Sequence, residues 1–190
     1  MIPILYPADQ TSFWTNNGLG GLPDAISCVV TEQRNTAGGY WLEMDYPVNG
    51  LHFDLLAPER IIYAAPSMGN IPQPFRISRI SRPINGIVHI EAPHISSALK
   101  TIVTSGIQTG TNIGTIGRAY FTRAEELGQT FRFGFASNVV APSSITFDHR
   151  EPASLMDVLL GTEGSILDLA GGEFEWYDWD VVLHAQRGVD

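Results

Sequence analysis

The alternation of apolar and polar residues along the first hundred residues restricts the fold most, because a period of two is typical of a strand with one buried face. It is clearest over residues 40–46. One face of this segment carries only large apolar or aromatic side chains: Tyr40, Leu42, Met44 and Tyr46. The other face carries Trp41, Glu43 and Asp45. Residues 25–32 alternate as well and put Cys28 between Ile26 and Val30, so a hairpin with a loose loop at 34–39 is predicted.

Two more strands are predicted at 59–66 and 74–81, and Asn85-Gly86 is the dipeptide that a two-residue type I′ turn requires. Folding there brings the apolar residues of two segments to one face: Phe75, Ile77, Val88, Ile90 and Ala92. Arg79 and Ile80 then point to the wrong faces, so we expect a bulge near them or a different turn.

The pattern changes near residue 95. The polar, Thr- and Gly-rich segment 96–111 is read as a connection that leads to a helix over 112–127, with Gly128 after its end. Strands are predicted at 131–135 and 144–149. Pro152 fits the first turn of a helix that stops at Gly161, and a short helix over 165–170 stops at Gly171. Strands at 173–177 and 180–185 form a closing hairpin.

These elements predict a β-rich α+β protein with three parts. Residues 1–95 form a β-rich unit, 96–170 form a small inserted α/β segment, and the hairpin of 171–190 returns to the first sheet.

Charge excludes some classes of partner. The chain has 190 residues and a net charge of −9, and residues 151–190 hold nine acids against Arg187 alone. An acidic chain without a basic stripe is a poor candidate for binding nucleic acid or an anionic membrane. There is neither an apolar run of membrane-spanning length nor a signal-peptide pattern, so we expect no membrane insertion.

The sequence lacks the common catalytic signatures, and we predict no catalytic, cofactor-binding or metal-binding residues and no cofactor. The five histidines are scattered without metal-ligand spacing: His52, His89, His94, His149 and His184. The sole cysteine, Cys28, is expected to be buried and unreactive, because it alternates with apolar residues. The glycine-rich GLGGLP at Gly18 is read as a loop.

Two clusters leave alternatives open. Four acids of the closing hairpin could bind calcium or act as an acid/base pair, although a solvated strand face explains them better: Glu173, Glu175, Asp178 and Asp180. Four tryptophans could serve as stacking platforms for a carbohydrate: Trp14, Trp41, Trp176 and Trp179. Trp41 shares a polar face with two acids, which points to a protein partner.

Several segments resemble the N-terminal region of the prophage tail endopeptidase (tail-associated, minor structural protein) family. They cover most of the chain in the family's order: DAISCVVTEQRN, YWLEMDYPV, QPFRISRI, IVHIEAPHIS, the run from GTEGS to DVVLH, and Gln186-Arg187-Gly188. The most specific are Tyr46-Pro47 and Gly171–Phe174. The chain departs from the family by a longer loop after Asn35. It also stops at Asp190, where family members usually continue, so a fragment is expected.

The resemblance implies a tail-hub β-barrel, a structural component of the tail tip or baseplate hub in the virion, produced in the cytoplasm of the bacterial host. It implies a homotrimer in the intact tail, with the distal tail protein and the tape measure as partners, and only weak association of this chain alone. Any cell-wall-cleaving activity of the family would lie downstream. Two alternatives stay open: a tail-associated peptidase or cell-wall hydrolase, and a carbohydrate-binding module of the virion.

Overall fold

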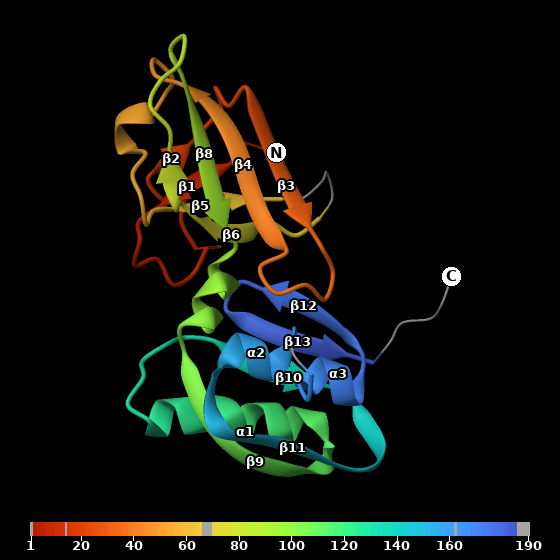
Figure 1. The fold of residues 1–190 in the computed structure, drawn as a ribbon. Helices are drawn as coiled ribbons and strands as arrows, with labels where there is room; N and C mark the ends of the chain where they lie inside the picture. Colours follow the sequence, from red (N-terminus) through yellow and green to blue (C-terminus); the bar gives the residue numbers. More distant parts are fainter. Residues whose placement is uncertain (1, 14, 66–69, 162, 186–190) are drawn as a thin grey trace, which may run out of the picture. The chain divides into compact units, whose positions relative to one another are not determined.

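The computed structural model describes residues 2–13, 15–65, 70–161 and 163–185, which form two compact units (Figure 1). Unit 1 comprises residues 1–33 and 38–95, and unit 2 comprises residues 34–37 and 96–190. Strands account for 43% and helices for 19% of the structure, which confirms the β-rich class. The last boundary between the units, between Ile95 and Ser96, coincides with the change in the sequence pattern near residue 95.

Unit 1 contains two antiparallel sheets of four strands. The first has the order β2-β1-β5-β6 and consists of Gly20–Gly21, Ile4–Tyr6, Ile61–Ala64 and Gln73–Arg76. The second has the order β3-β4-β8-β7 and consists of Ser27–Glu32, Tyr40–Pro47, Ile87–Pro93 and Arg79–Ile80. A short 3₁₀ helix, η1, spans Phe53–Leu55. Both sheets are open, so the described strands do not close the barrel that the sequence resemblance implies.

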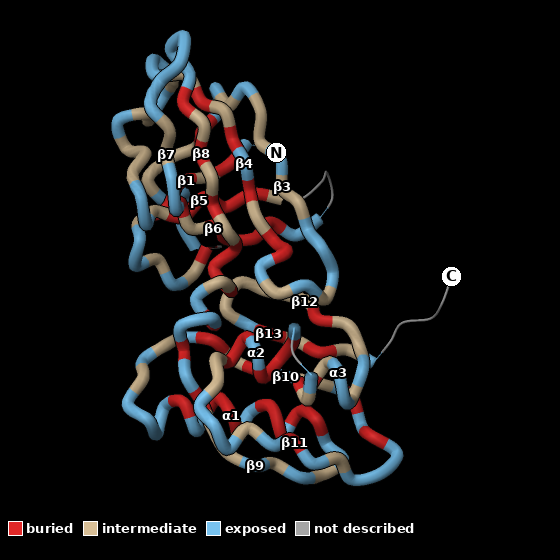
Figure 2. Tube along the Cα trace, viewed as in Figure 1, coloured by how far each residue is buried: buried red, intermediate tan, exposed pale blue. Residues whose placement is uncertain are grey.

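Both sheets of unit 1 contain buried residues (Figure 2). On β4 the predicted inner face is buried throughout, at 7% exposure or less: Tyr40, Leu42, Met44 and Tyr46. Tyr40 contacts Phe75 of the other sheet edge to face, with ring centroids 5.2 Å apart. His94, which is 1% exposed, stacks on Tyr40 at 4.7 Å. The alternation of β4 therefore identified the buried face correctly.

The segment predicted as a single strand over 74–81 is divided between the two sheets. The amide of Ile77 donates to the carbonyl of Arg60, beside β5, whereas the amide of Ser78 donates to the carbonyl of Glu91 on β8. The chain thus leaves the first sheet after β6 and enters the second as β7. This transfer explains why Arg79 and Ile80 did not fit the predicted register, and it replaces the expected bulge.

The turn at Asn85-Gly86 is confirmed. Both residues have positive φ, 52° and 76°, and the flanking Ile84 and Ile87 exchange backbone hydrogen bonds of 2.9 and 3.0 Å. Local backbone preferences fix this turn, so the dipeptide alone was sufficient to predict it.

Unit 2 contains two smaller sheets, and its first helix contacts both. The sheet β10-β13-β12 consists of Gly134–Ser137, Asp180–His184 and Glu173–Tyr177. The pair β11-β9 consists of Val140–Ser154 and Val103–Asn112. The helices are α1 (Ile113–Glu126), α2 (Leu155–Leu159) and α3 (Ile166–Ala170), with the 3₁₀ helix η2 (Ile95–Lys100) before them. None of the described helices has the length and apolar character of a membrane span.

Helix α1 is close to the predicted range 112–127. Asn112 caps its N-terminus by accepting a 2.9 Å hydrogen bond from the amide of Thr115, and Gly128 follows its end with φ of 82°. The hydroxyl of Tyr120 donates to the carbonyl of Phe147 on β11 at 3.0 Å. This buried bond ties the middle of the helix to the β9–β11 pair.

Two local predictions in this unit are wrong. Most of β9, Val103–Asn112, lies in the segment 96–111 that was predicted to be a connection. The faces of this strand are only partly buried, so no apolar alternation marks it. Pro152 does not open a helix but lies in β11, within the irregular stretch between His149 and Ala153 where a residue without an amide hydrogen fits. The helix begins at Leu155, because the hydroxyl of Ser154 caps it by accepting from the amide of Asp157 at 3.0 Å.

The closing hairpin also differs from the prediction that it returns to the first sheet. Strands β12 and β13 pair with each other, and β13 pairs in parallel with β10, so the hairpin belongs to unit 2. Val181 and Leu183 of β13 are fully buried there. Residues 34–37 belong to the same unit: the side chain of Asn35 donates to the carbonyl of Gly172 at 3.0 Å and accepts from the amide of Phe174 at 2.9 Å.

Candidate interaction surface on the β3–β4–β8–β7 sheet

The outward face of the second sheet of unit 1 carries polar, charged and aromatic side chains from neighbouring strands. Trp41 and Asp45 are half-buried and Glu43 is exposed, as the alternation of β4 predicts. The register with β8 places Trp41 opposite Pro93, Glu43 opposite Glu91, and Asp45 opposite His89. The face therefore presents an apolar pair, an acidic pair and an Asp–His pair in successive rows.

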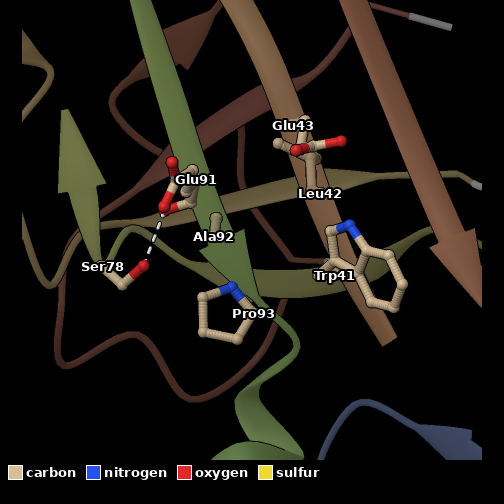
Figure 3. Close-up of a pocket in the computed structure, with 7 residues that line it drawn as sticks. All are labelled: Trp41, Leu42, Glu43, Ser78, Glu91, Ala92 and Pro93. Carbon is tan, nitrogen blue, oxygen red and sulfur yellow. Dashed lines mark hydrogen bonds between the residues drawn. The ribbon is translucent and has the colours of Figure 1, made fainter. Parts of the chain in front are cut away.

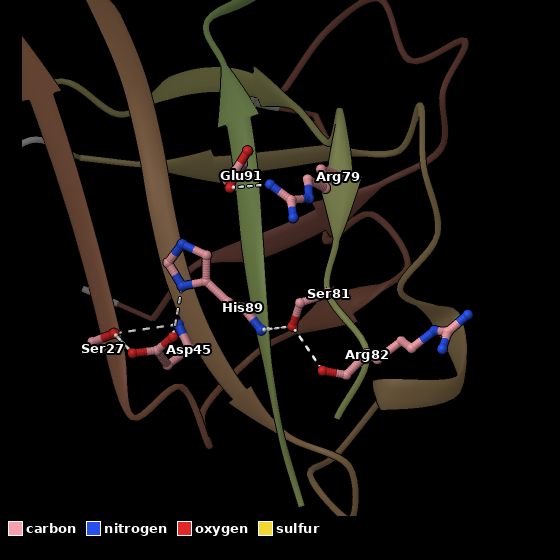
Figure 4. A network of polar contacts seen from close by, with 7 residues as sticks. All are labelled: Ser27, Asp45, Arg79, Ser81, Arg82, His89 and Glu91. Atoms are coloured by element: carbon pink, nitrogen blue, oxygen red, sulfur yellow. Dashed lines mark hydrogen bonds and ion pairs between the residues drawn. The ribbon is translucent and has the colours of Figure 1, made fainter. Parts of the chain in front are cut away.

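The Asp–His pair is the centre of a polar network (Figure 4). The Oδ1 of Asp45 lies 2.8 Å from the Nδ1 of His89, and its Oδ2 accepts from the hydroxyl of Ser27 at 3.0 Å. On the other side, the amide of His89 donates to the hydroxyl of Ser81 at 2.8 Å. The hydrogen bonds from His89 and Ser27 stabilise the carboxylate and lower the pKa of Asp45.

The network joins a serine, a histidine and an aspartate, but its geometry does not activate a nucleophile. A catalytic serine must donate to a ring nitrogen of the histidine, so that the imidazole can accept its proton. Ser27 donates to Asp45 instead. The arrangement therefore fixes strands β3, β4 and β8 to one another and orients His89, without the contact that acyl transfer requires.

A shallow pocket of about 220 Å³ lies beside this network (Figure 3). We call it the Trp41 pocket; it is lined by Trp41, Leu42, Glu43, Ser78, Glu91, Ala92 and Pro93. The Nη1 of Arg79 forms an ion pair with the Oε1 of Glu91 at 3.1 Å. Among the described residues, no basic side chain pairs with Glu43.

The structure keeps the remaining histidines apart. His52 contacts the carbonyl of Gly21 through Nδ1 at 2.9 Å, His94 is in the core of unit 1, and His149 contacts the ring of Tyr120. His184 pairs with Glu175, with 2.7 Å between Nε2 and Oε2. Across the described ranges, no group of three or more His, Cys, Asp or Glu side chains is placed to hold a metal ion.

The acids of the closing hairpin are not assembled into a joint site. Glu173 pairs with Arg34 at 3.3 Å, and Glu175 pairs with His184. Asp178 occupies the turn with φ of 51°, a backbone conformation that Asp tolerates. Ion pairing and turn formation thus account for three of these carboxylates. Trp176 and Trp179 of the same hairpin are half-buried, whereas Trp14 and Gln186–Gly188 lie outside the described residues.

Cys28 is half-buried rather than buried, which corrects the prediction from sequence. It lies on β3, an edge strand of its sheet, and its neighbour Ile26 is 59% exposed. An edge strand has a neighbouring strand on one side only, so its apolar residues are covered less than those of β4. Burial is still sufficient to raise the pKa of the Cys28 thiol to about 11.

The raised pKa predicts that Cys28 reacts slowly in the folded protein. Because the thiolate is the nucleophile, a rise of the pKa from 9.0 to about 11 lowers the reactive fraction, and the alkylation rate near neutral pH, about 100-fold. Mass spectrometry of iodoacetamide labelling over time, with and without urea, measures this ratio. Equal rates in the folded and the urea-unfolded chain would contradict the prediction.

Comparison with solved structures finds the same fold in the prophage tail protein gp18 from Listeria monocytogenes EGD-e. The two structures superpose with a TM-score of 0.64 at 18% sequence identity, and the match covers 97% of this chain and 51% of that one. This chain therefore spans about half the length of that structure. No family model and no curated protein matches the sequence. The similarity includes both units, so the two proteins share a fold along nearly the whole of this chain.

Proposed function

We propose that the protein is a structural component of a phage or prophage tail and is carried in the virion. The observation that supports this role best is the similarity in fold, across 97% of the chain, to a prophage tail protein. The described surface of unit 1 fits a structural role, since its Ser–Asp–His network links strands and lacks the contact that activates a nucleophile. The resemblance of several sequence segments to tail-associated proteins agrees with this role.

The finer proposal is a position at the tail tip or baseplate hub, as a homotrimer that links the tail tube to the distal tip during attachment and DNA ejection. The distal tail protein and the tape measure are the proposed neighbours. The net charge of −9 supports a part that DNA passes without binding, because like charges repel.

Purified particles provide the test of the tail role. Tails from an induced lysogen that encodes the chain should contain it in a fixed ratio to the tail-tube protein, as measured by mass spectrometry. Immunogold labelling in the electron microscope should place it at the end of the tail far from the capsid. Cross-linking of these tails should yield a trimer of the chain.

Each of these measurements can contradict its own part of the proposal. Absence of the chain from purified tails would exclude the structural role, and gold along the whole tube would exclude the tip position. A cross-linked dimer without a trimer would exclude the three-fold ring, since a two-fold contact does not build it.

A further inference from the structure

We propose that the Trp41 pocket is a docking site for an arginine side chain of a different polypeptide. This inference rests on the proposed tail function only for the identity of that polypeptide. The choice of arginine depends only on the residues that line the pocket.

The pocket lies across the two neighbouring strands β4 and β8. Strands β4 and β8 are antiparallel, and their register puts Trp41 beside Pro93 and Glu43 beside Glu91 on the same outward face (Figure 3). Side chains directly opposite on paired strands have Cβ atoms about 5 Å apart. The pocket thus combines an indole ring, a proline ring and two carboxylates within the reach of one long side chain.

The pocket carries negative charge that the described residues only partly neutralise. Two carboxylates opposite each other on neighbouring strands repel and destabilise the sheet. Arg79 pairs with Glu91 only, and its own side chain is 69% exposed. Within the part of the chain that the structure describes, Glu43 has no cation beside it. The pocket therefore has one more carboxylate than the fold neutralises, and a positive group supplied from outside would remove the repulsion.

The lining of the pocket suits a guanidinium group better than an ammonium group. A guanidinium group stacks on an indole face and also forms two parallel hydrogen bonds with one carboxylate. An ammonium group is a compact, strongly hydrated charge that lacks the planar stacking surface. Trp41 beside Glu43 matches both properties of the guanidinium, so arginine is favoured over lysine.

The acidic character of unit 1 indicates which polypeptide supplies the arginine. Counted from the sequence, unit 1 has eight acidic and four basic residues, and the whole chain has a net charge of −9. At this pocket a second copy of unit 1 would bring twice as many acidic as basic residues, so charge complementarity favours a different protein with a basic surface. Under the proposed function that protein is a neighbouring component of the tail.

The test uses the full chain and a blocked Gly-Arg-Gly peptide as probe. Titration should shift the NMR signal of the Trp41 indole N–H with a dissociation constant of about 1–10 mM, as expected for one side chain. The matched peptide with citrulline, which keeps the shape and removes the charge, should bind about tenfold more weakly. Lysine in place of arginine should also bind more weakly.

Variants separate the pocket from general charge attraction. Glu43→Gln should weaken binding of the arginine peptide about tenfold in the indole titration. Trp41→Ala, whose binding is followed through the backbone amide signals of β4 and β8, should weaken it by a similar factor. Asp54→Asn, which removes one negative charge from an exposed residue of η1 outside the pocket, should leave it unchanged. Urea unfolding of each variant shows that the sheet remains folded.

Several outcomes would overturn the proposal. Equal binding of arginine and citrulline, an equal effect of Asp54→Asn, or no saturable shift would each do so. Binding of chitin or glucan oligosaccharides with no response to arginine would assign the pocket to a carbohydrate. A Trp41 indole signal that changes when the chain alone is diluted would show that a second copy of the chain occupies the pocket. Because the titration needs no virion, its result is independent of whether the chain is found in tails.

Discussion

Replacing Gly117 with alanine is expected to destabilise unit 2 by about 2–3 kcal/mol, although alanine is the better helix former by about 1 kcal/mol. Gly117 lies in α1 where the helix approaches β10. A Cβ atom there would lie 2.1 Å from the Cε1 and 2.3 Å from the Cδ1 of Phe135. The Phe135 ring is buried beside Phe121, with centroids 5.8 Å apart, so it cannot move away freely.

Urea unfolding followed through the Trp176 and Trp179 indole signals measures the effect in unit 2. The matched control is Gly110→Ala on β9, where the added Cβ would meet its nearest atom, the Cδ1 of Ile116, at an ordinary 3.7 Å. This control should be neutral or stabilising. Phe135→Leu should recover part of the loss when combined with Gly117→Ala. A neutral Gly117→Ala would show that the helix and β10 are not in the close contact described.

Gly117 illustrates what the sequence can and cannot predict. The sequence places the helix over 112–127 and its end before Gly128 correctly, because the signal that ends a helix acts within a few residues. The reason for a glycine inside it lies in Phe135, which approaches from another element. The same limit applies to β9, whose partly exposed faces carry no apolar alternation. It also applies to the closing hairpin, because β13 pairs in parallel with β10, and the paired residues Gly134 and Asp180 are 46 residues apart in the sequence.

The candidate surface was predictable in part. The alternation of β4 placed Trp41, Glu43 and Asp45 outward, and the structure confirms this. It could not show that Glu91 and Pro93 lie opposite, because the register between β4 and β8 depends on how both strands cover the core. The passage of the chain from β6 to β7, which brings Arg79 to Glu91, is a property of two sheets and has no local signal.

The resemblance to tail proteins agrees with the shared fold, and the more specific relation to an endopeptidase-family hub remains a prediction.

The second large effect concerns pH and His94. Acidification from pH 7 to pH 4.5 is expected to destabilise unit 1 by about 2.5 kcal/mol through this residue. Burial lowers the pKa of His94 from 6.5 to about 3, since the ring lies in the core between Tyr40 and Phe75. Below pH 6.5 the unfolded chain therefore binds a proton that the folded chain does not bind until about pH 3. The unfolded state gains stability relative to the folded state over that interval, and the loss reaches its full size near pH 3.

His94→Phe separates this effect from other titrations, because phenylalanine keeps a flat ring against Tyr40 and cannot be protonated. Any packing cost of the substitution is the same at both pH values and cancels in the difference. Urea unfolding followed through the Trp41 indole signal should show that the variant loses much less stability than the native chain between pH 7 and pH 4.5.

His149, whose pKa is also lowered by burial, lies in unit 2 and acts in the same direction, so His149→Phe is the matched control for unit 1. Asp45 does not interfere. Its lowered pKa stabilises the folded state at pH values above 3.8, the ordinary pKa of this group. That stabilisation is lost only at pH values below the interval from pH 7 to pH 4.5. An equal loss in the native chain and in His94→Phe would show that the ring is protonated within the fold, and the stacked, buried arrangement with Tyr40 would then be wrong.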